Sequence, residues 1–176
     1  MLFSSMTFIY VFLPIVLLIY LLSKKSLHNY ILLGASIIFY AWGEPRYLAI
    51  MFLTILVNYF GAIFIDRYKD YKKTILILTI LVNLGFLVYF KYFNFLIRNL
   101  NGLFHTNIVG LNIIMPIGIS FYTFQALSYV IDVYRGHNKA QKNIFNLALY
   151  ISFFPQLIAG PIVKYHDIEN QTLNRN

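Results

Sequence analysis

The feature that most constrains this chain is a series of long apolar runs, separated by short clusters of charged or turn-forming residues. A helix needs about 20 apolar residues to cross roughly 30 Å of hydrocarbon, where its backbone hydrogen bonds must close within the segment. Six apolar runs stand at residues 3–22, 30–42, 47–65, 74–90, 111–133 and 143–162. The second is only about 13 residues long, too short for an ordinary crossing, and is either a short, buried crossing or a re-entrant piece. We therefore predict an all-α, polytopic transmembrane helical protein with about six membrane segments.

The amino-acid composition excludes the main alternative classes of protein. Of the 176 residues, 60% are hydrophobic and only 11% are charged, whereas a typical soluble domain carries about 25% charged residues. There is too little polar surface to coat a water-soluble globule. Intrinsic disorder is excluded as well, because disordered chains are poor in aromatic residues and this chain holds 17 Phe and 15 Tyr. The lipid bilayer is therefore the first partner that we expect.

The net charge of +8 fits a membrane protein without a nucleic-acid partner. Its 14 Lys and Arg residues lie mainly between the apolar runs, which is typical of cytoplasmic flanks and of contact with anionic headgroups. The first run is followed by Lys24 and Lys25 and preceded by no basic residue, which indicates a permanent helix rather than a cleaved signal peptide. The absence of cysteine excludes disulfides and cysteine nucleophiles.

The basic residues of alternate loops predict the orientation of the chain. With the N-terminus outside, nine of them face the cytoplasm: Lys24, Lys25, Arg67, Lys69, Lys72, Lys73, Arg135, Lys139 and Lys142. Five face the outside: Arg46, Lys91, Arg98, Lys164 and Arg175. We therefore predict an integral membrane protein whose N-terminus lies outside.

Helix breakers stand beside polar side chains in the last two apolar runs. The breakers are Pro116, Gly118, Pro155, Gly160 and Pro161. The polar residues are Ser120, Tyr122, Thr123, Gln125, Ser128, Tyr129 and Gln156. Such groups line a cavity or tunnel, or they form hydrogen bonds between helices. The breakers favour the cavity, and they predict that residues 111–133 form a broken helix, after a loop at residues 100–107.

Ionisable groups in or near the membrane region are candidates for function because their burial is costly. Lys91 lies in an aromatic stretch, where we expect it to reach the headgroups. Asp132 precedes Arg135 by three residues, which favours a structural ion pair at the membrane boundary. The four histidines are His28, His105, His137 and His166, all in predicted loops or flanks. We interpret them as surface residues, although His166 stands beside an acid. The sequence carries no Walker, GxGxxG, GxSxG or HExxH motif.

Four stretches are more specific than aromatic membrane sequence in general. They read FYAWGEPR at residues 39–46, YFKYFNF at 89–95, MPIGISFYTFQ at 115–125 and FFPQLIAGP at 153–161. In this order and approximate spacing they resemble the N-terminal part of the membrane-bound O-acyltransferase (MBOAT) family, in its bacterial alginate and peptidoglycan O-acetyltransferase branch. The resemblance extends along nearly the whole chain.

The resemblance implies an enzyme of the bacterial cytoplasmic (inner) membrane, built as a ring of helices around a funnel. Such an enzyme passes an acyl group, typically acetyl, to a hydroxyl of an extracytoplasmic polysaccharide such as alginate or peptidoglycan, or to a downstream extracytoplasmic acetyltransferase. The acyl donor, acetyl-CoA or an acyl carrier, is a substrate, and no bound cofactor or metal is expected. Tyr122, Gln125 and Gln156 are the candidates for lining the substrate tunnel.

The resemblance transfers no catalytic residue to this chain, because the family's catalytic histidine lies beyond the matched region. We expect residues 1–176 to be the N-terminal portion of a single MBOAT-like transmembrane domain, a fragment that is inactive without the C-terminal catalytic portion. Two alternatives remain open. One is D-alanyl transfer to teichoic acid within the same family, and the other is a non-catalytic membrane subunit or a transporter-like protein.

Overall fold

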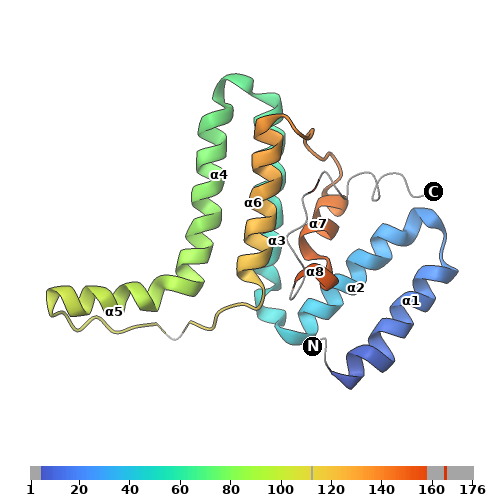
Figure 1. Cartoon of the computed structure of the whole chain (residues 1–176), viewed down its shortest axis with the longest axis horizontal. Coiled ribbons are helices and arrows are strands. Elements are labelled where there is room, and N and C mark those ends of the chain that lie inside the picture. Colours follow the sequence, from blue (N-terminus) through green and yellow to red (C-terminus); the bar gives the residue numbers. More distant parts are fainter. Residues whose placement is uncertain (1–4, 112, 158–164, 166–176) are drawn as a thin grey trace.

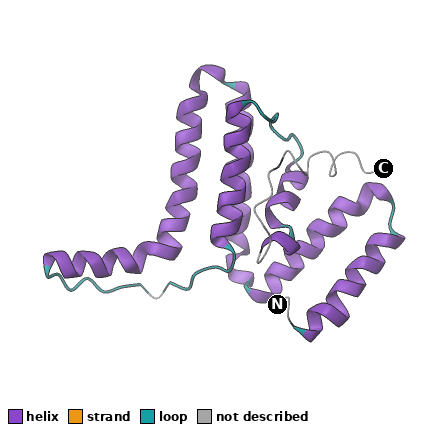
Figure 2. Cartoon of the chain, in the orientation of Figure 1, coloured by secondary structure: helices purple, strands orange, loops and turns teal. Residues whose placement is uncertain are grey.

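The computed structural model describes residues 5–111, 113–157 and 165 (Figure 1), and all of their regular secondary structure is helical (Figure 2). The α-helices are α1 (Leu13–Leu22), α2 (His28–Gly43), α3 (Leu48–Arg67), α4 (Lys72–Leu87), α5 (Phe93–Phe104), α6 (Ile119–Arg135), α7 (Ile144–Ser152) and α8 (Phe154–Leu157). Turns of π-helix at Phe8–Phe12 and Val88–Tyr92 lead into α1 and α5. Turns of 3-10 helix at Lys25–Leu27, Pro45–Tyr47 and Lys69–Tyr71 precede α2, α3 and α4. The prediction of an all-α protein is confirmed.

Two helical stretches of the described chain are long and apolar enough to cross a membrane. They are Pro45–Arg67, of 23 residues, and Lys69–Phe104, of 36 residues. A shorter apolar helix covers Phe8–Leu22. These lengths support a membrane location, while the number of six membrane segments stays a prediction.

Helices α3, α4 and α6 pack side by side at the centre of the fold (Figure 1). Met51 and Ile55 of α3 and Tyr129 and Val130 of α6 are buried together in this core, and Leu147 of α7 joins them. Helix α2 packs against α7, and α1 packs against α2. The central helices therefore bury side chains against one another, whereas α1 packs mainly against α2.

A pair of amide side chains joins α3 to α4 within their apolar interface. Asn58 Nδ2 donates to Asn83 Oδ1 at 2.8 Å, and Asn83 Nδ2 donates back to Asn58 Oδ1 at 3.2 Å. Each amide also donates to a carbonyl one turn earlier, that of Thr54 or Thr79. The helices approach closely at Gly61, where a Cβ would lie 2.6 Å from Thr79 Oγ1. Small residues and polar pairs of this kind hold helices together in lipid, where the hydrophobic effect does not.

The helical path turns sharply between α4 and α5, and α5 extends away from the bundle (Figure 1). The turn occurs at the π-helical residues Val88–Tyr92, and an inserted π turn is a common cause of a helix kink. The predicted loop at residues 100–107 is partly wrong, because α5 continues to Phe104 and ends at His105, whose φ is 51°. The physical reason is that the Asn101 side chain binds the returning chain at Ile108 and leaves the helix backbone intact.

The predicted broken helix at residues 111–133 is helical in its second part alone. Residues 113–117 form no helix, and α6 begins at Ile119. Gly118 has a φ of 76°, a conformation that favours glycine. The helix ends at Gly136, where the amides of Gly136 and His137 return to the carbonyls of Val133 and Asp132, the pattern of a Schellman motif.

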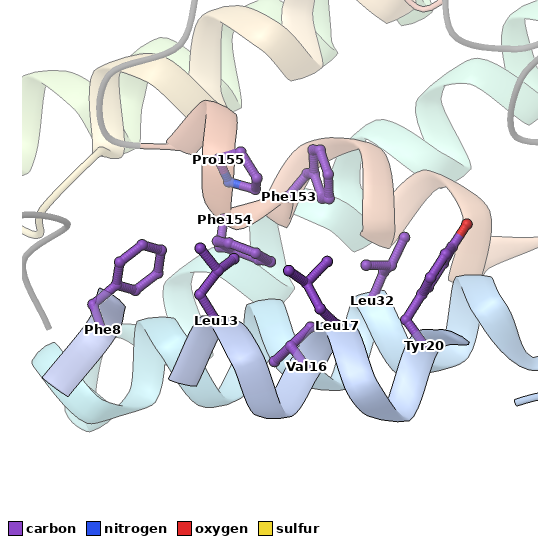
Figure 3. A pocket seen from close by; sticks show the side chains of 9 residues that line it. All are labelled: Phe8, Leu13, Val16, Leu17, Tyr20, Leu32, Phe153, Phe154 and Pro155. Atoms are coloured by element: carbon purple, nitrogen blue, oxygen red, sulfur yellow. The ribbon is translucent and has the colours of Figure 1, made fainter. Parts of the chain in front are cut away.

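An aromatic cluster connects the N-terminal π turn to α2 and α8. The ring centroids of Phe8 and Phe39 lie 5.5 Å apart, and those of Phe12 and Phe154 lie 5.6 Å apart. Beside this cluster lies an apolar pocket of about 550 Å³ between α1, α2 and the junction of α7 with α8. Figure 3 shows Leu13 of α1 pointing toward Phe154 across this pocket. None of the three tunnel candidates is among its lining side chains.

Candidate functional site

The first turns of α6 bring together residues from all four of the family-like stretches. We call this region the α6 junction, and we define it by Tyr40, Glu44, Lys91, Ile117, Ser120, Tyr122, Gln125 and Gln156. These residues come from α2, the turns before α3 and α5, the Gly118 turn, α6 and α8. Stretches from residues 39–46 to residues 153–161, more than a hundred positions apart in the sequence, thus meet in one place, which is the structural basis of the candidate site.

Gly118 allows the α6 junction to close against α8. With its φ of 76°, Gly118 turns the chain into α6, and a Cβ at this position would lie 2.9 Å from the Leu157 carbonyl oxygen. A side chain would therefore be opposed both by the backbone conformation and by the neighbouring backbone. On the other side of the same turn, the Ile117 amide donates a hydrogen bond of 2.8 Å to Glu44 Oε2. The Glu44 carboxylate thereby fixes the turn to the end of α2.

Gln125 and Gln156, two of the predicted tunnel residues, are hydrogen-bonded to each other. Gln125 Nε2 donates to Gln156 Oε1 at 3.1 Å and to the Tyr150 carbonyl at 2.7 Å. Gln125 is buried, whereas Gln156 is half-buried. The Gln125 amide therefore donates to the Tyr150 carbonyl near the end of α7 and connects α6 to both α7 and α8.

The break between α7 and α8 is closed by side chains from neighbouring helices. Gln125 supplies a donor to the Tyr150 carbonyl, and the Ser36 hydroxyl of α2 accepts a hydrogen bond of 3.2 Å from the Phe154 amide. Non-helical backbone at membrane depth requires such partners, because neither lipid nor an apolar core can provide them. Pro155 stands at this break, as the sequence predicted for a helix breaker.

Tyr122, the third tunnel candidate, is completely buried and faces α2. Its phenol hydroxyl interacts with that of Tyr40 and lies near the Glu44 carboxylate. The neighbouring Thr123 hydroxyl is buried and has no hydrogen-bond partner among the described residues. A buried hydroxyl without a partner is rare in proteins.

Lys91 reaches the α6 junction from the bend between α4 and α5. Lys91 Nζ donates a hydrogen bond of 3.3 Å to Ser120 Oγ and lies 5.5 Å from the centre of the Tyr92 ring. The ammonium group is exposed. The predicted aromatic surroundings of Lys91 are therefore present, while its contact with headgroups stays a prediction.

The polar residues further along α6 form hydrogen bonds between elements, one of the two interpretations that the sequence left open. Tyr129 Oη accepts a hydrogen bond of 2.8 Å from the Gln141 amide. The predicted ion pair between Asp132 and Arg135 is wrong, because Asp132 Oδ1 lies 3.6 Å from His137 Nδ1 instead. The Schellman turn carries His137 back over the end of the helix, whereas Arg135 stays exposed to solvent.

The described histidines do not gather into a catalytic or metal site. His28 stacks on Tyr20, with ring centroids 4.0 Å apart, and His105 and His137 are exposed. Within the described residues, no group of three His, Cys, Asp or Glu side chains is placed to hold a metal ion. His166, Gly160 and Pro161 lie outside the described residues, so the predictions made for them are not examined by the structure.

Sequence reasoning missed Tyr40, Glu44 and the carbonyl of Tyr150 as parts of the junction. Glu44 stands between Gly43 and Pro45, a context typical of a turn. One signal was present, since Glu44 is the first acidic residue of the chain and the next is Asp66. A single carboxylate among apolar segments needs a specific partner, and here this partner is the Ile117 amide.

Comparison with known proteins gives relatives that match the chain from end to end. No protein-family model and no solved structure matches it. A protein of Pseudomonas putida named probable alginate O-acetylase AlgI is 40% identical over 99% of this chain and 38% of its own length. Its namesake in Pseudomonas aeruginosa is 39% identical over 99% of the chain and 35% of its own length. A peptidoglycan O-acetyltransferase of Helicobacter pylori is 31% identical over 100% of the chain and 39% of its own length.

The chain spans little more than a third of the length of these relatives. Two different polysaccharides stand in their names, and the O-acetyl group is common to both. Along its whole length the chain is therefore a homologue of part of the alginate O-acetylases and of a peptidoglycan O-acetyltransferase, which confirms its resemblance to this branch of the membrane-bound O-acyltransferase family.

Proposed function

We propose that this chain is part of a membrane O-acyltransferase that transfers an acyl group, with acetyl favoured, to hydroxyl groups of an extracytoplasmic polysaccharide such as alginate or peptidoglycan. The observation that carries the proposal is the match of 99–100% of the chain to relatives whose names share O-acetylation and differ in the polysaccharide. We assign the matched region to the step that these relatives have in common, which is the transfer of the acetyl group within the membrane. The acceptor is then selected by other parts of such a protein.

The reaction places defined demands on the site. The acceptor hydroxyl oxygen attacks the acyl carbonyl, a base removes the hydroxyl proton, and the donor's leaving group departs as the new ester forms. None of the described histidines is held in a way that suits this base. We assign to this chain the wall of the substrate passage rather than the base, so that the chain alone is inactive. The donor, acetyl-CoA or an acyl carrier, is a substrate, and no bound cofactor is required.

The α6 junction is the section of wall that suits a polar substrate best. Thr123 holds a buried hydroxyl without a hydrogen-bond partner among the described residues, Tyr122 presents a buried phenol beside it, and Gln156 is half-buried and bonded to Gln125. An acyl carbonyl or a sugar hydroxyl needs such donors and acceptors when it leaves water. We place these residues along the passage as binding groups, in a protein of the inner membrane whose N-terminus lies outside.

The activity is tested in the organism that encodes the chain. Deletion of the gene removes the acetate that mild base releases from its peptidoglycan or its extracellular polysaccharide, and a plasmid copy of the complete gene restores it. Loss of ester-linked D-alanine with unchanged acetate assigns the protein to teichoic acid D-alanylation instead. Unchanged ester-linked acetate and D-alanine in both fractions contradicts the proposal.

The wall residues are tested with variants of the same plasmid copy. Gln156→Leu lowers ester-linked acetate roughly tenfold at an unchanged amount of membrane-inserted protein, because the loss of about 1.4 kcal/mol of binding or transition-state stabilisation has that effect. Gln125→Leu lowers the amount of protein itself, since the Tyr150 carbonyl loses its donor. Gly102→Ala, in open space on α5, serves as the matched control. Normal acetylation by Gln156→Leu excludes the passage role.

A further inference from the structure

We propose that α5 and the described residues of the returning chain, 105–111 and 113–118, form an arm that lies in the plane of the bilayer surface, with one apolar side in the acyl chains and with Lys91 and Arg98 at anionic headgroups. The inference does not depend on the proposed function, because it rests on the length, charge and exposed side chains of this segment alone. The occupant that we assign to this surface is lipid.

The length of the helical path requires that it leave the hydrocarbon. Lys69–Phe104 is 36 residues long, which corresponds to about 54 Å of α-helix, while the hydrocarbon core is roughly 30 Å thick. The path bends at Val88–Tyr92, after a length that suffices for one crossing. Beyond the bend, α5 runs across the direction of α4 (Figure 1). If α4 crosses the membrane, this bend directs α5 along the membrane surface.

The two sides of α5 differ in the way that an interfacial helix requires. Most of its exposed apolar side chains fall at helical spacing on one side, where Leu96 is 44%, Leu100 43% and Leu103 75% exposed, while Phe95 lies off this side. The α1 helix, by contrast, exposes apolar side chains over most of its circumference, among them Ile15, Leu17 and Leu18, as a helix largely surrounded by lipid does. The predominantly one-sided pattern of α5 matches a boundary between apolar and polar surroundings.

The other side of α5 binds the returning chain through two asparagines. Asn94 Nδ2 donates a hydrogen bond of 2.7 Å to the Leu111 carbonyl. Asn101 Nδ2 donates to the Ile108 carbonyl at 2.9 Å, and Asn101 Oδ1 accepts from the Ile108 amide at 3.0 Å. Asn101 Oδ1 also accepts from the Thr106 hydroxyl. These bonds satisfy irregular backbone that would otherwise be costly near lipid, and they make helix and returning chain one unit.

The charge of the arm selects the lipid surface over other partners. Residues 88–118 contain Lys91, Arg98 and His105 but no Asp or Glu. A cationic and amphipathic segment is attracted to anionic headgroups. Tyr89 and Tyr92 stand at the bend, where aromatic side chains mark a membrane boundary.

The arm is tested with spin labels on single cysteines, for which this chain has no background because it contains no cysteine. Leu100→Cys and Leu103→Cys lie on the apolar side, while Gly102→Cys is exposed and points away from it, because the helix turns by about 100° per residue. A label at Leu81 of α4, which is 60% exposed, gives the value for full contact with lipid. The chain is reconstituted in vesicles of phosphatidylcholine with a minor fraction of phosphatidylglycerol. Collision rates with oxygen and with a water-soluble nickel complex are then compared.

We expect the ratio of oxygen to nickel collisions to be roughly threefold higher at residues 100 and 103 than at residue 102, as for a helix half immersed in lipid. Equal access of the nickel complex to all three labels overturns the proposal in favour of an arm in water. Immobile labels at residues 100 and 103 that neither reagent reaches overturn it in favour of a protein partner on this surface.

The charge argument has its own measurement. In vesicles without phosphatidylglycerol, the label at residue 103 becomes more accessible to nickel, and Arg98→Gln produces the same change when the anionic lipid is present. Asn99→Gln, a neutral change on the same helix, has no such effect. An unchanged label depth in Arg98→Gln shows that anionic headgroups do not hold the arm and removes that part of the proposal.

Discussion

At the scale of single residues, Gly118 decides how α6 begins. Its φ of 76° and the 2.9 Å between a built Cβ and the Leu157 carbonyl oxygen exclude a side chain for two separate reasons. Glu44 holds the same turn through the Ile117 amide. One glycine and one carboxylate thus position the helix that carries Tyr122 and Gln125.

We predict that Gly118→Ala lowers the free energy of unfolding by about 1–3 kcal/mol, because the alanine is strained and meets backbone rather than a flexible side chain. Gly102→Ala is the matched control. It lies in α5 with open space around it, so the change is neutral or stabilises by about 0.5–1 kcal/mol. Thermal unfolding of both variants in detergent, followed by circular dichroism, measures the difference. Equal stability of the two variants contradicts the argument.

The tunnel candidates show the limit of sequence reasoning at this scale. Tyr122, Gln125 and Gln156 were selected because polar side chains stood beside helix breakers. The structure brings Gln125 and Gln156 into contact at 3.1 Å and directs Tyr122 toward Tyr40. No periodicity could have shown these partners, because Gln156 and Tyr40 lie on other helices. The passage itself stays a prediction.

At the scale of elements, α3 and α4 form a hairpin that is specified by polar and small residues. The reciprocal bonds between Asn58 and Asn83 satisfy both amides at once, and Gly61 permits the close approach. The apolar residues of these helices cannot specify the pairing, because they contact lipid as favourably as each other.

We predict that Asn58→Leu or Asn83→Leu alone lowers the free energy of unfolding by about 1–2 kcal/mol, since the remaining amide is left unpaired in an apolar interface. The double variant is less destabilised than the sum of the two single variants, because no unpaired amide remains. Unfolding in mixed micelles with increasing sodium dodecyl sulfate measures all four proteins of the cycle. Strict additivity would falsify a direct interaction between the two amides.

The sequence predicted most of the long helices within a few residues and was wrong about the end of α5. Apolar runs bounded by charged clusters mark α3 and α4 plainly, because both signals are local. The loop predicted at residues 100–107 rested on polar residues such as Asn101 and Asn107, although Leu96, Leu100 and Leu103 follow helical spacing. A short amphipathic helix has too few apolar residues to resemble a membrane segment, and its role depends on what its apolar side meets.

At the scale of the whole molecule, the excess of basic residues in alternate loops predicts the direction of every crossing. Reporter fusions measure this directly. We expect a green fluorescent protein fused after residue 70 to fluoresce, because this loop is predicted to be cytoplasmic, and an alkaline phosphatase fused after residue 105 to be active, because the arm is predicted to lie outside. The exchanged fusions, alkaline phosphatase after residue 70 and green fluorescent protein after residue 105, serve as controls and are expected to be inactive. If only the exchanged fusions are active, the predicted orientation is wrong.

Sequence alone determined that this chain is helical, that it is built for a membrane and that it resembles polysaccharide O-acetyltransferases. These properties depend on local quantities, namely the length of apolar runs, the absence of charge within them and the identity of short stretches. Only the tertiary structure decided that the four stretches meet at the start of α6, that Asn58 and Asn83 pair, and that α5 turns away from α4. Hydrogen bonds between residues far apart in the chain depend on which helices become neighbours, and lipid-facing apolar sequence leaves that choice to a few small and polar residues.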